Sequence, residues 1–328
     1  MAYDNLKLEK GLYTTGKSFT KALEELDPSE NYRGTELEGL DAFERQLKRF
    51  DIKVSGPDSD TISKFYSTST SSVLFPEFIS RAVKAGVDGN GKIEKIIATT
   101  TEIDSLDYRA LKYTDSMDFS LAQINEGGVL PECQISVSSD LTRLKKYGKI
   151  LKASYEAIKF QKLDLFSITL AKIGEKISNS QFETALDTVF GSCENVVEIA
   201  GESLAYSDLV NLWLELQPYN ATTLIVSRDS AAKILTLPEL RDANAGLDFH
   251  GTGRFITPFG AEVIVYDTGT DYGVFALDNT CALEKVQAGG IVTEFDKLID
   301  CQLERAAIST IVGFAPIYED AAAILTEE

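Results

Sequence analysis

The most regular hydrophobic pattern of the chain lies between residues 164 and 191. Apolar side chains recur there at helical spacing, at Phe166, Leu170, Ile173, Ile177, Phe182, Leu186 and Val189. This spacing predicts one apolar face of a long α-helix. Asp164 is a suitable N-cap and Gly191 a suitable C-terminal stop. At a rise of about 1.5 Å per residue, the helix should be about 40 Å long.

Shorter helical patterns precede this segment. An amphipathic helix fits residues 37–50, whose apolar side chains form a stripe. Residues 65–72, which are rich in serine and threonine, indicate an extended arm. Pro76 then predicts the start of a short helix that ends at Gly86.

Residues 88–160 favour β structure. The sequence Asp88-Gly89-Asn90-Gly91 is a hairpin turn signal. Long strands are expected at 93–103, 118–124, 135–144 and 150–158. The middle two flank residues 125–132, a polar segment with a Gly-Gly pair and a proline. This segment predicts the tip of a hairpin that protrudes from the body of the protein.

Residues 200–290 alternate between helix and strand patterns, which indicates a compact α/β domain. The expected elements are a helix from Ser207, a strand at 223–226, a helix from Ser227 that ends before Pro238, and a strand at 261–266. Two long strands follow, at 291–299 and 303–312. They are far in sequence from the early β segments, so they should complete their sheet late.

Composition narrows the function classes. The chain has 328 residues, 44% hydrophobic and 25% charged, as in globular proteins with a core. No apolar run is long enough to cross a membrane. The formal net charge of −19 argues against a nucleic-acid-binding protein, because neutralising phosphate needs clustered lysine and arginine.

Charge is unevenly distributed along the chain. Residues 140–176 hold nine basic and four acidic side chains, whereas residues 194–328 hold seven basic and twenty-two acidic ones. The basic strand within the first stretch carries Arg143, Lys145, Lys146 and Lys149. Charge complementarity between copies of the chain is one interpretation, and a solvated strand face is the other.

Few residues suggest catalysis. His250 is the only histidine, and no group that could orient it is apparent. The four cysteines form no CxxC pair, so an ordinary zinc site is excluded. Residues 11–18 fit the P-loop pattern, but the residues before Gly11 cannot form the buried strand that such a site requires. A P-loop ATPase is therefore a remote alternative, and we expect no enzyme, cofactor or metal site.

An arm and a hairpin that cannot bury themselves need partners, which indicates an assembly protein. Several short segments resemble those of a known family. They are the helix at 75–79, Asn125-Glu126-Gly127-Gly128 with Pro131-Glu132, the lysine-rich strand 144–150, and residues 224–229, 237–242 and 259–263. In this order, over residues 65–328, the chain resembles tailed-bacteriophage major capsid proteins of the Hong Kong ninety-seven fold.

The resemblance implies an α+β fold with an N-terminal arm, an extended hairpin called the E-loop, a P-domain with a long spine helix and long strands, and an α/β A-domain. The expected boundaries are an N-terminal segment at 1–64, the arm at 65–91, the E-loop with flanking P-domain strands at 92–160, the spine helix at 161–199, the A-domain at 200–290, and P-domain strands at 291–328. The expected assembly contacts of the E-loop tip are Glu126, Gly127, Gly128, Leu130, Pro131 and Glu132.

The resemblance also implies partners and a location. The chain would assemble with itself into pentamers and hexamers of a phage head in the virion, formed in the host cytoplasm. A separate scaffolding protein, a portal and a decoration protein are further expected partners, and packaged DNA would be contacted only non-specifically. An encapsulin, a bacterial cargo compartment of the same fold, remains the main alternative.

Some relatives cross-link themselves through a lysine that precedes the E-loop proline and an asparagine in the late strands. Here Leu130 precedes Pro131, and no asparagine follows Asn279. We therefore expect a shell without covalent cross-links.

Overall fold

A computed structural model describes residues 2–14, 18–114, 126, 134–154, 160–199, 201, 203–241, 255–267, 273–298 and 303–326. Contacts divide the chain into two compact units. Unit 1 comprises Met1–Asn90, Tyr147–Ser178 and Ile291–Thr310, and unit 2 comprises Gly91–Lys146, Asn179–Gly290 and Ile311–Glu328. None of the described helices combines the length and apolarity needed to cross a lipid bilayer.

Unit 1 begins with short helices. Their bounds are Ala2–Asn5 and Lys10–Thr14 (both 3-10), α1 at Phe19–Leu26, Ser29–Tyr32 (3-10) and α2 at Ala42–Arg49. The helix predicted from residue 37 starts later, because the Asp41 side chain accepts a hydrogen bond from the Glu44 amide and the Glu44 carboxylate accepts one from the Asp41 amide. This capping box sets the start of α2.

The expected extended arm at 65–72 is wrong. Two 3-10 helices occupy this region, at Ile62–Tyr66 and Ser71–Leu74. Phe65 and Leu74 are fully buried in the core of unit 1. The Ser71 hydroxyl donates to the Phe65 carbonyl at 2.7 Å. Serine side chains that bond to nearby backbone favour such turns, and the apolar residues between them bury the segment.

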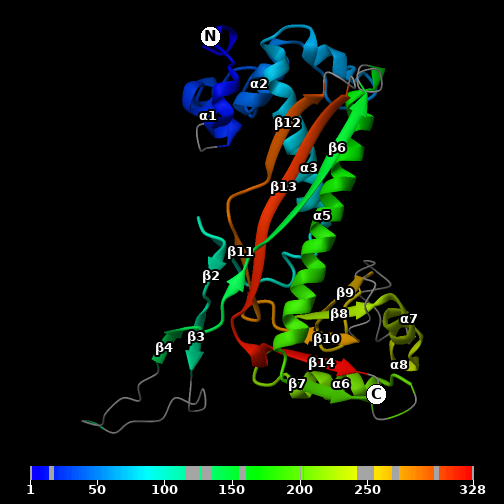
Figure 1. Ribbon diagram of the computed structural model, residues 1–328. Coiled ribbons are helices and arrows are strands. Elements are labelled where there is room, and N and C mark those ends of the chain that lie inside the picture. Colours follow the sequence, from blue (N-terminus) through cyan, green and yellow to red (C-terminus); the bar gives the residue numbers. More distant parts are fainter. Residues whose placement is uncertain are drawn as a thin grey trace. The chain divides into compact units, whose positions relative to one another are not determined.

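Helix α3 spans Phe75–Asn90 and does not stop at Gly86. The prediction of a hairpin turn at 88–91 is also wrong, because residues 88–90 form the last turn of helix α3. Gly86 instead meets the long helix α5, Leu163–Ser192, where the two helices lie side by side (Figure 1). A Cβ on Gly86 would lie 2.0 Å from the Ala171 carbonyl oxygen, and one on Gly174 would lie 2.1 Å from the Val83 carbonyl oxygen. The two glycines let the backbones approach.

The long helix and the late strands are confirmed. Helix α5 has 30 residues, which corresponds to a length of about 45 Å at about 1.5 Å per residue. Strand β12, Val292–Leu298, pairs antiparallel with β13, Leu303–Pro316, and β6, Lys145–Ser154, also pairs with β13 (Figure 1). The core of unit 1 combines apolar residues of α1, α2, α3 and α5, so the N-terminal helices are an integral part of it.

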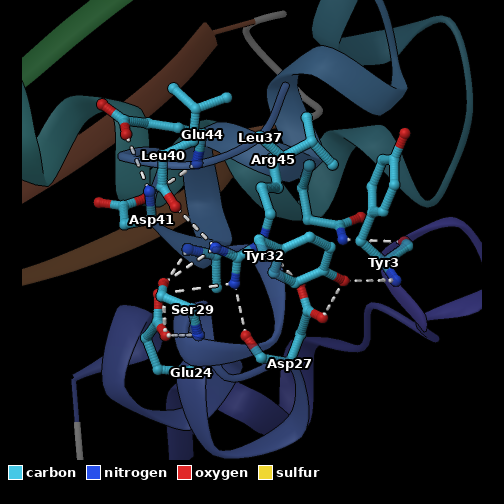
Figure 2. A network of polar contacts seen from close by, with 12 residues as sticks. Tyr3, Glu24, Asp27, Ser29, Tyr32, Leu37, Leu40, Asp41, Glu44 and Arg45 are labelled. Carbon is cyan, nitrogen blue, oxygen red and sulfur yellow. Dashed lines mark hydrogen bonds and ion pairs between the residues drawn. The ribbon is translucent and has the colours of Figure 1, made fainter. Parts of the chain in front are cut away.

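A buried ionic network lies among the N-terminal helices (Figure 2). The Arg45 Nε atom donates to Asp27 Oδ2 at 2.8 Å, and both side chains have 0% exposure. Tyr32 donates its hydroxyl to the other Asp27 oxygen at 2.5 Å, and the guanidinium lies over the Tyr32 ring. Further bonds from the guanidinium reach Ser29 Oγ and the Leu40 carbonyl. The buried charges are thus paired and hydrogen-bonded, as burial requires.

Unit 2 contains an α/β domain, but its sheet takes two strands, Asn195–Glu198 and Ala322–Thr326, from outside the predicted range 200–290. Its five-stranded sheet has the order β7-β14-β10-β8-β9. The strands are β7 at Asn195–Glu198, β14 at Ala322–Thr326, β10 at Val274–Leu277, β8 at Thr223–Ser227 and β9 at Glu262–Tyr266. The helices are α6 at Tyr206–Glu215, α7 at Arg228–Thr236 and α8 at Pro238–Arg241. Ser227 caps α7 as predicted, by accepting a hydrogen bond from the Ser230 amide.

The rest of unit 2 is built from short strands. Strand β1, Thr99–Glu102, pairs parallel with β11, Leu283–Gln287, and β11 pairs with the end of β13. Two ribbons follow: β2, Asp107–Tyr108, pairs with β5, Thr142–Arg143, and β3, Leu111–Thr114, pairs with β4, Gln134–Val137. The strands predicted at 93–103 and 135–144 are therefore too long. The strand predicted at 118–124 lies outside the described residues.

Candidate assembly surfaces

The ribbon of β3 and β4 exposes apolar side chains. Leu111 and Val137 face each other across the ribbon, and their exposed fractions are 62% and 59%. Leu106 and Leu141 are also exposed. A two-stranded ribbon has no second layer in which to bury such residues, so this surface is suited to contact another molecule.

Of the expected hairpin tip, residues 125–132, the structure describes a single residue, Glu126. Glu126 lies in a turn and is exposed. Gly127, Gly128, Leu130, Pro131 and Glu132 lie outside the described residues. The tip contacts therefore stay a prediction.

A buried carboxylate fixes the base of the hairpin, a feature that the sequence reasoning missed. Glu284 on β11 is buried and accepts hydrogen bonds from the hydroxyls of Thr101 on β1 and Tyr108 on β2. The Tyr108 bond measures 2.9 Å. Burial, together with the adjacent carboxylate, raises the pKa of Tyr108 to about 12. Tyr108 therefore stays protonated at neutral pH and remains a donor. A glutamate among many carries no sequence signal for such a role.

The basic strand is exposed as predicted from its composition. Arg143 lies on β5, and Lys145, Lys146 and Lys149 lie on β6. All four side chains are exposed. None of them forms an ion pair with another described residue. Their positive charge is therefore available to another molecule.

A groove of about 220 Å³ lies in unit 2 between the hairpin base and the end of β13. It is lined on one side by Ala110, Leu111, Ser138, Asp140 and Thr142, and on the other by Glu194 and residues 315–320. Four of the lining residues are acidic: Asp140, Glu194, Glu319 and Asp320. This groove could not be predicted from the sequence, because its walls come from three distant segments.

The features considered for catalysis do not assemble into a site. Residues 2–5 and 10–14 form 3-10 helices, so the described residues before and within the P-loop pattern contain no strand. Thr15, Gly16 and Lys17 lie outside the described residues, as does His250. No group of metal-binding side chains occurs in the part of the chain that the structure describes. Burial raises the pKa of the Cys193 and Cys281 thiols, which disfavours reactive thiolates.

Comparison with known proteins decides the fold. The model of the phage capsid protein family matches residues 138–298, slightly less than half of the chain. A virus-like particle from Pyrococcus furiosus has 16% identity and a TM-score of 0.53, covering 76% of this chain and 98% of that one. The capsid of Cyanophage P-SCSP1u has 12% identity and a TM-score of 0.51, covering 72% and 88%. This chain has the Hong Kong ninety-seven-type capsid fold. The predicted resemblance to phage capsid proteins is confirmed.

The solved structures that resemble this chain also include an encapsulin. An encapsulin complex from Synechococcus elongatus has 11% identity and a TM-score of 0.52, covering 73% of this chain and 87% of that one. No curated protein sequence matches the chain. Together, the family match and the fold support a capsid shell protein.

Proposed function

We propose that the chain is the major capsid protein of a tailed phage. The observation that carries this proposal is the capsid fold, in a chain whose residues 138–298 match the phage capsid family. The exposed ribbon of β3 and β4 supports it, because an apolar hairpin surface requires a neighbour. The chain would form pentamers and hexamers of an icosahedral head that encloses double-stranded DNA.

The proposal includes partners and a location. Copies of the chain would assemble in the cytoplasm of a host bacterium, guided by a separate scaffolding protein, and one vertex would hold a portal. A decoration protein is a further candidate partner. The formal net charge of −19 supports only non-specific contact with the packaged DNA, because like charges repel.

An encapsulin shell is the second candidate, favoured by the likeness to the Synechococcus elongatus complex. Electron microscopy of the purified, assembled protein tests both functions. Closed shells built from hexamers and pentamers support a capsid-type shell, and their absence under all assembly conditions contradicts it. Portal and terminase genes beside the coding gene would favour the phage head, and a cargo-enzyme gene would favour the encapsulin.

We expect the hairpin tip to hold a neighbouring subunit. Deletion of residues 125–132 should leave a folded, soluble protein that forms no shells. The deletion removes only the tip beyond the ribbon of β3 and β4, and with it the expected contact to a neighbouring subunit. Electron microscopy and circular dichroism measure the two properties. A variant with a glycine-serine sequence of the same length is the control that separates lost contacts from shortening. Normal shells from both variants would refute this role.

We expect mature particles to contain no covalent cross-links, because the lysine and the asparagine of the cross-linking relatives have no counterpart here. Boiled and reduced particles should give one band near 36.0 kDa on a denaturing gel. A ladder of larger bands that survives reduction would contradict this expectation.

A further inference from the structure

The acidic groove of unit 2 has the features of a docking surface for a basic segment. The side chains of Asp140, Glu194 and Asp320 are exposed, and none of them forms an ion pair with another described residue. Apolar atoms of Leu111, Pro316 and Ile317 line the same groove. A segment that combines cationic heads with apolar stems, as lysine and arginine do, would satisfy both kinds of lining.

The basic strand begins next to this groove in sequence, but strand geometry directs Arg143 away from it. Thr142 lines the groove. Arg143 follows Thr142 in the same strand, β5, and successive side chains of a strand point to opposite faces. Neither Arg143 nor any lysine of β6 lines the groove. Within one copy, the basic strand therefore does not fill the acidic groove, and both surfaces remain open to another molecule.

A second copy is the partner that the charge pattern favours. Most pairs of surfaces on two copies repel, because each chain carries a formal net charge of −19. The stretch 140–176, with nine basic and four acidic side chains, is an exception. When this basic stretch contacts an acidic surface of another copy, opposite charges meet, and the electrostatic interaction between the two copies at that place becomes attractive.

We propose that the acidic groove of one copy binds the basic strand of a neighbouring copy, with Arg143, Lys145 and Lys149 facing Asp140, Glu194 and Asp320. Lys145 and Lys149 share one face of β6, because successive side chains of a strand alternate between its faces. This inference rests on the proposed function and names the surfaces through which the copies meet. The two surfaces differ, so the contact is head-to-tail. Such a contact generates closed rings when its rotation closes. Five- and six-membered rings of one chain need a contact of this kind.

Charge reversal tests the contact. One variant carries Lys145→Glu and Lys149→Glu, a second carries Glu194→Lys and Asp320→Lys, and a third carries all four changes. We expect the fraction of protein in particles to fall about tenfold or more in each of the first two variants, because like charges then meet. In the third variant the pairing is restored with reversed signs, so shells should return. Sedimentation and electron microscopy measure the particles.

The controls separate this contact from net charge and from the proposed function. Lys21→Glu with Lys84→Glu changes the formal charge as much as the first variant, at two exposed lysines outside the stretch 140–176, and should assemble normally. No recovery in the fourfold variant, while the parent chain forms shells, would overturn the contact. Normal shells with less packaged DNA in the first variant would assign the strand to DNA and also overturn it. Failure of the parent chain itself to form shells would contradict the proposed function instead.

Discussion

Replacing Asp27 by alanine is expected to lower the free energy of unfolding of unit 1 by about 3–5 kcal/mol. The Arg45 guanidinium, at 0% exposure, would lose the carboxylate that accepts its Nε–H at 2.8 Å. Its other hydrogen bonds, to Ser29 and to the backbone carbonyls of Leu40 and Asp27, are to neutral groups, and its remaining anion, Glu24 at 3.7 Å, is 30% exposed. The substitution also removes the acceptor of the Tyr32 hydroxyl. Urea unfolding followed by circular dichroism measures the change.

Two variants make this expectation specific. Asp296→Ala breaks the ion pair with Arg305, whose side chain is 40% exposed, and should cost about 1 kcal/mol or less. Combining Asp27→Ala with Arg45→Met removes both charges and should recover most of the lost stability. Equal, small losses from Asp27→Ala and Asp296→Ala would show that the buried network contributes no more than a surface pair.

Replacing Gly86 by alanine is expected to destabilise unit 1 by about 1–3 kcal/mol, although alanine is the better helix former by about 1 kcal/mol. The new Cβ would lie 2.0 Å from the Ala171 carbonyl oxygen. That oxygen belongs to the backbone of α5 and cannot rotate away, so the helices must separate. The measurement is again urea unfolding.

Gly89 provides the matched control for this substitution. It lies on the same helix, α3, and a Cβ there would meet nothing within 4 Å. Gly89→Ala should therefore stabilise the protein by up to about 1 kcal/mol. Opposite signs at two glycines three residues apart would show that the crossing with α5, rather than helix propensity, determines the effect at Gly86. Stabilisation by both substitutions would contradict the close approach.

The long helix, the late strands and the α/β domain could be predicted because each has a periodic pattern, although α5 extends past both predicted end signals, Asp164 and Gly191. Ser227 and Pro238 bracket α7 through backbone chemistry that acts within a few residues. Gly86 and the glycines of 88–91 were misinterpreted because their role depends on a residue far away in the sequence. A glycine marks a turn or a close approach, and only the tertiary partner distinguishes the two. Ala171, the partner of Gly86, lies 85 positions further along the chain.

Of the candidate surfaces, the basic strand could also be predicted from the sequence and the acidic groove could not. The exposure of Lys145 and Lys146 follows from their charge, and composition was enough to predict a basic strand. The groove could not be predicted, because Asp140, Glu194 and Asp320 come from segments that meet only in the folded chain. Glu284 was hidden among 51 acidic side chains, and its burial depends on the pairing of β1 with β11.

The strand order has a consequence for synthesis of the protein. Strand β14 lies between β7 and β10, and β13 lies between β11 and β12, so both sheets have an interior strand from residues 303–326. A ribosome adds residues in order, at about 5–20 per second, and these residues are the last of the described chain to leave it. Until then, neighbouring strands in both sheets lack hydrogen-bond partners. Neither sheet can therefore be completed before residues 303–326 have emerged, so both units finish folding late.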